Sequence, residues 1–173
     1  MLSTREIQTE LKLLNYRLLK NSKGRQKQDT RYAMIKKYQP EEKNFLTYVV
    51  DRKLNRVISV FESLVGANGI GCGKGMTRPG VFFLSDKESP GASQKAHWGN
   101  GRNYYAIDDV DTQCPTCTDC VFHSNKNMQP PTESNGQKSL GCTVVAEEVY
   151  ACMERNKMFG DMLIYNPSPG GAD

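Results

Sequence analysis

The chain has 173 residues, of which 38% are hydrophobic, and a formal net charge of +4. This length is enough to bury a core without disulfides. Because no run of about eighteen apolar residues occurs, the sequence predicts no transmembrane helix. The charge is uneven, with a net +6 over residues 1–43 and a net −2 over residues 44–173. No nucleic-acid motif accompanies the basic segment, so we expect a solvated helix and arm and no nucleic-acid partner.

The first predicted element is a helix over residues 3–20. Ser3 and Glu6 have the spacing of a capping box, which marks a helix start. Apolar residues recur at helical spacing and form one stripe, made of Ile7, Leu11, Leu14 and Leu18. Residues 21–43 are polar and charged, which favours a linker or a docked arm with a short helix at 30–38.

Short runs of β-type residues predict strands in the rest of the chain, and turn residues join the first two into a hairpin. The runs are residues 45–50, 56–61, 81–84, 104–107, 120–123 and 161–165. Glycines crowd residues 66–75, but no helix and no Lys-Ser/Thr pair follows them, so they do not form a phosphate-binding loop. Many short strands with few helices predict a β-rich α+β fold.

Gly141 and Cys142 precede a segment with helical periodicity that runs to about Phe159. Glu147 suits the positive end of such a helix. The pattern therefore predicts that Cys142 lies just before a helix N-terminus. In that position a thiol pKa is lowered, and backbone N–H groups are available to an oxyanion.

A histidine precedes this cysteine at a spacing that permits nucleophilic chemistry. The chain has only two histidines, His97 and His123, and fifteen residues separate His123 from the sequence Ser139-Leu140-Gly141-Cys142. An imidazole can take the proton of a thiol and stabilise the thiolate as an ion pair. The alternative is a small buried cysteine and an incidental loop histidine.

The order His123-Ser124, then Ser139-Leu140-Gly141-Cys142, resembles the signature of the YkuD-type L,D-transpeptidases, cysteine enzymes that act on bacterial peptidoglycan. The similarity covers residues 44–166. Within it, residues 77–84 resemble the T-x-x-G-x-F turn and strand of that family, and residues 160–165 resemble its closing strand. Leu140 departs from the common signature, which has histidine there, and so does Val144, where arginine or asparagine is usual.

The resemblance implies a β-sandwich-like catalytic core over residues 44–173. One helix would follow the catalytic cysteine, and the helix and arm of residues 1–43 would be an accessory. It implies that Cys142 attacks the amide before the terminal D-Ala of a peptidoglycan tetrapeptide stem. His123 would hold the thiolate and protonate the departing amine, and N–H groups of Cys142 and Gly141 would stabilise the oxyanion. No cofactor or metal is required.

The same resemblance suggests side chains that contact substrate. Ser124 and Ser139 are candidates to orient His123 or the stem. Arg78 is a candidate to bind a stem carboxylate, or else to support its own turn, and Trp98 is either a stacking wall or an ordinary loop anchor. An amine acceptor would give a cross-link, whereas water would give an L,D-carboxypeptidase or a wall-targeting effector.

The remaining cysteines allow two kinds of site. The compact run Cys114-Pro-Thr-Cys117-Thr-Asp-Cys120 suits disulfides in an oxidising compartment. With Cys72, His97 or Cys152 it equally suits zinc, which would make the chain an interaction domain with a structural Cys142. In a disulfide scheme we expect Cys152 to be a buried thiol.

The peptidoglycan substrate implies a periplasmic or extracellular location. Residues 1–30 have no apolar signal-peptide core. Three alternatives therefore remain: an export signal that was removed, export by another secretion system, or a protein that stays inside the cell.

Overall fold

The computed structural model describes residues 1–88, 103–117, 120–125, 128, 139 and 141–169. Eight strands form one sheet in the order β3-β2-β1-β8-β4-β5-β6-β7. The strands are β1 (Tyr32–Gln39), β2 (Asn44–Asp51), β3 (Arg56–Ser63), β4 (Gly80–Glu88), β5 (Tyr105–Asp111), β6 (Val121–Asn125), β7 (Thr143–Ala146) and β8 (Met162–Asn166). The helices are α1 (Thr4–Leu19), α2 (Ser22–Gln26) and α4 (Glu147–Arg155).

The sheet curls until its two ends meet. Beyond β3, the N–H of Leu64 donates to the carbonyl of Val144 in β7 at 3.1 Å. Further along, the N–H of Ser139 donates to Val65, and the N–H of Ala67 donates to Ser139. These hydrogen bonds satisfy backbone N–H and C=O groups that the edges of an open sheet would leave unpaired. The sheet is therefore a near-barrel. The fold is β-rich α+β, as predicted, and its strands form one curled sheet.

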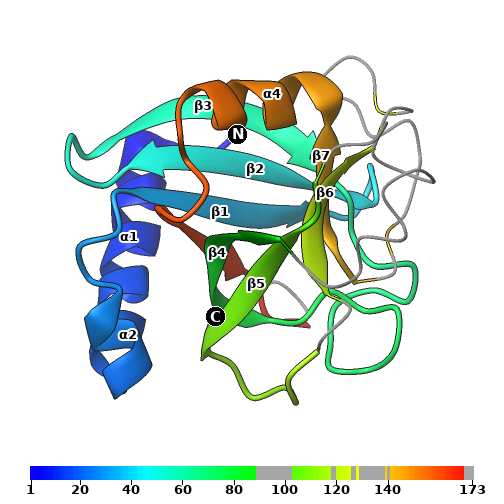
Figure 1. Ribbon diagram of the computed structural model, residues 1–173, viewed down its shortest axis with the longest axis horizontal. Helices are drawn as coiled ribbons and strands as arrows, with labels where there is room; N and C mark the ends of the chain where they lie inside the picture. Colours follow the sequence, from blue (N-terminus) through cyan, green and yellow to red (C-terminus); the bar gives the residue numbers. More distant parts are fainter. Residues whose placement is uncertain (89–102, 118–119, 126–127, 129–138, 140, 170–173) are drawn as a thin grey trace.

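Helices cover opposite faces of this sheet (Figure 1). On the outer face, Ala33 and Ile35 of β1 pack against the apolar stripe of α1. On the inner face, Met34 packs with Tyr150 and Met153 of α4. This alternation along β1 is the period of two that a strand requires.

The predicted N-terminal helix is confirmed, together with its cap. Ser3 accepts from the N–H of Glu6, and the Glu6 carboxylate accepts from the N–H of Ser3. All four residues of the apolar stripe are buried, with exposures of 0–5%. Arg17 fastens the last turns of α1 to the sheet through an ion pair with Asp111 at 2.7 Å.

The predicted hairpin is also confirmed, since β2 and β3 pair antiparallel. The short helix expected at 30–38 is wrong, because those residues form most of β1. That strand lies between β2 and β8, antiparallel to the first and parallel to the second. Partners on both sides outweigh weak local propensity. The division of the chain at residue 44 remains a proposal.

The segment after Cys142 also differs from the prediction. Residues 143–146 form β7, and α4 begins only at Glu147 and ends at Arg155 rather than near Phe159. The β-branched run Thr143-Val144-Val145 favours a strand, and β6 offers it a parallel partner. Cys142 therefore precedes a strand rather than a helix.

Candidate active site

The strand pair β6–β7 determines how His123 and Cys142 lie relative to each other. Within this parallel pair His123 is in register with Val144. Cys142 lies in a bend directly before β7, two residues from Val144. Cys142 is partly buried, and it packs against a cluster that contains Val144. The structure thus places His123 on β6 and Cys142 at the start of the adjacent strand β7, and a direct contact between their side chains stays a prediction.

His123 is a buried neutral base. It is 7% exposed, and its Nδ1 lies 2.8 Å from the carbonyl oxygen of Ser124. A carbonyl only accepts, so Nδ1 carries the proton and Nε2 keeps its lone pair. Burial lowers the pKa of His123, and the Ser124 carbonyl opposes this effect only in part. The imidazole is therefore neutral at neutral pH, with an unprotonated Nε2, and burial disfavours its cation beside a thiolate.

We expect the imidazole of His123 to titrate below 6.5, its ordinary pKa. The folded state resists protonation, so the unfolded chain binds more protons as the pH falls below 6.5. The stability that the neutral imidazole contributes is therefore fully present above pH 6.5, and it is lost as the pH falls from 6.5 to the pKa of His123 in the folded protein. NMR titration of the ring signals measures the value, with His97→Gln to assign the two histidines. A His123 pKa above 6.5 would contradict the burial effect.

Tyr104 was not among the predicted site residues. Antiparallel pairing of Tyr105 with Phe122 carries Tyr104 alongside His123. Their rings stack with centroids 4.4 Å apart and planes 10° from parallel. Burial, and then the negative charge of Cys142, raise the pKa of Tyr104 to about 12. Tyr104 is therefore a neutral phenol within electrostatic reach of the thiol, and only the pairing of distant strands reveals it.

Gly141 shapes the turn that presents Cys142. Its φ is +108°, which favours glycine, and an added Cβ would lie 2.8 Å from the carbonyl oxygen of Met76. The N–H of Gly141 donates to Ser139 Oγ at 3.1 Å. This N–H is thus engaged within the turn, and a role for it in stabilising an oxyanion remains a prediction.

The predicted substrate contacts have partners within the protein. Ser124 is completely buried and donates to Glu147 Oε1 at 3.1 Å, which ties β6 to α4. Ser139 is 5% exposed and is engaged by Gly141. Arg78 is also 5% exposed and forms an ion pair with Asp109 at 2.9 Å. Trp98 lies outside the described residues. Contact of any of these with substrate stays a prediction.

Lys36 is a second residue that the prediction missed. It is 1% exposed, and its Nζ donates to Thr143 Oγ1 at 2.9 Å. The ammonium also lies 5.2 Å from the ring centroid of Phe45. Burial lowers the pKa of Lys36 to about 7, although the negative charge of Cys142 raises it. The pair Lys36-Lys37 looked like part of a solvated arm because its strand was not recognised.

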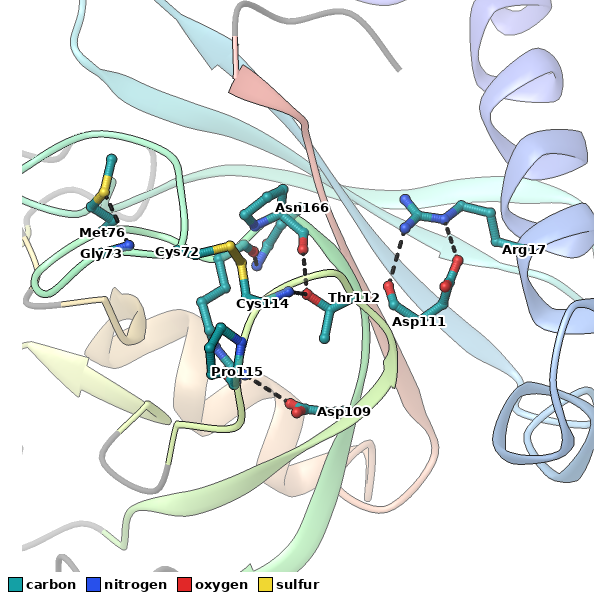
Figure 2. The surroundings of a disulfide bond; sticks show 12 residues. Arg17, Cys72, Gly73, Met76, Asp109, Asp111, Thr112, Cys114, Pro115 and Asn166 are labelled. Carbon is teal, nitrogen blue, oxygen red and sulfur yellow. Dashed lines mark hydrogen bonds and ion pairs between the residues drawn. A yellow bond between two sulfur atoms is a disulfide. The ribbon is translucent and has the colours of Figure 1, made fainter.

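The cysteine cluster consists of disulfides. Cys72 is bonded to Cys114, and Cys117 to Cys120. Figure 2 shows the first bond, which joins the glycine-rich loop after β3 to the segment after β5. Thr112 Oγ1 supports that segment by accepting from the N–H of Cys114 at 3.1 Å.

These bonds correct two expectations. A zinc domain built on 114–120 is wrong, because sulfur atoms paired in disulfides offer no thiolate to a metal. No group of three or more metal-binding side chains occurs among the described residues. Cys152 is exposed rather than buried, because it lies on the solvent side of α4.

No family model and no curated protein matches the chain. Its structure is similar to that of Bd1075 from Bdellovibrio bacteriovorus, with a TM-score of 0.51 and 16% identity over 80% of this chain and 48% of Bd1075. L,D-transpeptidase 1 of Mycobacterium tuberculosis is a more distant neighbour, with a TM-score of 0.38 and 15% identity over 78% of this chain and 61% of that protein. The first likeness shows a shared fold, and the second is too distant to add a conclusion. The chain spans about half the length of Bd1075.

Proposed function

We propose that the chain is a cysteine acyltransferase of the L,D-transpeptidase type, acting on peptidoglycan tetrapeptide stems. The observation that carries this proposal is the register of β6 and β7, which puts His123 opposite Val144, two residues from Cys142. The same two residues are the ones that match the family motif. Tyr104, stacked on His123, gives the imidazole a fixed orientation.

The chemistry follows from these groups. Nε2 of His123 takes the Cys142 proton, and the thiolate attacks the carbonyl before the terminal D-Ala. The tetrahedral intermediate collapses to a thioester, and the imidazolium returns its proton to the leaving D-Ala amine. Backbone N–H groups at the Cys142 turn are the candidate oxyanion donors, each worth about 3 kcal/mol in comparable sites.

The thioester is then resolved by an acceptor. A side-chain amine of a second stem gives a cross-link and frees the thiol. Water gives a tripeptide and makes the protein an L,D-carboxypeptidase, or a wall-targeting effector if it acts on another cell. Periplasmic or extracellular action is supported by the two disulfides. No helix among the described residues is long and apolar enough to span a membrane.

A product assay tests this proposal. A Cys152→Ala protein is incubated with disaccharide-tetrapeptide, with and without iodoacetamide pretreatment, and the products are measured by mass spectrometry. Cys142 is then the one cysteine outside the disulfides. We expect loss of D-Ala, with dimer for a transpeptidase or without it for a carboxypeptidase, and we expect alkylation to stop the reaction. Disaccharide-tripeptide, which lacks the D-Ala, is the matched control substrate. Tetrapeptide that remains unchanged would refute the proposal.

A further inference from the structure

Lys36 is a buried cation with an unusual set of partners. A buried ammonium normally has a carboxylate beside it, because an unpaired buried charge is costly. In the part of the chain that the structure describes, the polar contact of Lys36 Nζ is the Thr143 hydroxyl. The face of the Phe45 ring is the second neighbour of the ammonium. Stability alone gives no reason for a lysine here, since an apolar side chain would fill the space without the cost of desolvation.

The surroundings of Lys36 identify its electrostatic partner. On β2 its register neighbour is Thr47, whose hydroxyl is bonded to Ser63 of β3 at 2.8 Å, and both are neutral. Glu147, at the start of α4, accepts from Ser124 and is not among the groups that shift the pKa of Lys36. The titratable group that does interact with Lys36, among the described residues, is Cys142.

We propose that Lys36 is a positioning residue that holds a positive charge behind Cys142 and stabilises its thiolate. Thr143 orients the ammonium, and Thr143 is the residue next to Cys142. This inference deepens the proposed function and rests on Cys142 being its nucleophile. Lys36 and Thr143 are 107 positions apart in the sequence, and the curled sheet brings them together.

The proposal divides two tasks that one imidazolium would otherwise perform. Burial keeps His123 neutral, so His123 moves the proton. Lys36, which is charged below its pKa of about 7, supplies the positive charge that favours the thiolate. The interaction is reciprocal: the thiolate raises the pKa of Lys36, and the ammonium favours the thiolate.

The test measures the thiol directly, without substrate. In a Cys152→Ala background, the rate of Cys142 alkylation by iodoacetamide is followed from about pH 5 to pH 9, where a thiol profile reports its thiolate fraction. We expect Lys36→Met to raise the apparent pKa of the thiol by about one unit, which slows alkylation about tenfold near pH 7. Lys37→Met is the matched control, because Lys37 pairs with Glu10 on the other face of β1. Its profile should equal that of the parent.

A second variant keeps the test decisive if Lys36→Met does not fold. Thr143→Val removes the hydroxyl that orients the ammonium, and it should move the profile in the same direction by a smaller amount. Unchanged profiles in the folded variants would overturn the proposal. Because alkylation needs no peptidoglycan, this outcome is independent of the product assay: the thiol can depend on Lys36 even if the tetrapeptide is not the substrate.

Discussion

Replacing Cys142 with alanine should lower kcat/KM for D-Ala release by about 10⁴-fold or more, the loss typical of removing a catalytic nucleophile. The remaining acceleration would come from substrate binding and oxyanion stabilisation alone. Steady-state assays on disaccharide-tetrapeptide measure the effect. The melting temperature of the variant should stay close to that of the parent, because a half-buried thiol is a small loss of packing.

Cys152→Ala is the matched control for this experiment. It removes a thiol that is exposed on α4, so activity should be unchanged. If the Cys142 variant kept a tenth of the parent activity, the nucleophile would have to be sought elsewhere. Equal losses in the two variants would point to a general effect on folding instead.

Removing the Cys72–Cys114 disulfide should lower the free energy of unfolding by about 4 kcal/mol, because the bond closes a loop with a sequence separation of 42. Cross-linking restricts the unfolded chain, and a long loop restricts it most. In a domain of this size the melting temperature should fall by roughly 10 °C. The double variant Cys72→Ala/Cys114→Ala is compared with the parent by thermal and urea unfolding.

The second disulfide provides an internal comparison. Cys117 and Cys120 are separated by only 3 positions, so their double alanine variant should lose roughly 1.5 kcal/mol. An equal loss from both double variants would contradict the loop-length explanation. The Cys72–Cys114 disulfide also anchors the loop that contains Met76, whose carbonyl lies close to Gly141. Removing this disulfide should therefore loosen the turn before Cys142.

Much of the chain could be predicted because its signals are local. The N-terminal helix has its cap and its apolar stripe within eighteen residues, and the structure shows both the capping hydrogen bonds and the burial of the stripe. The β2–β3 hairpin depends on a turn between two adjacent β-type runs. The motif that singles out His123 and Cys142 is likewise contained in one short stretch of sequence.

Only the tertiary structure shows which residues that are distant in sequence pair with one another. β1 became a central strand because β2 and β8 lie on either side of it. The choice of disulfides over zinc, and the stacking of Tyr104 on His123, depended on how distant segments meet. Lys36 looked like a solvated charge, and only the curled sheet buries it and brings it to the hydroxyl of Thr143. Local periodicity specifies helices and hairpins, whereas closure of a sheet depends on contacts whose energy appears only after the chain has come together.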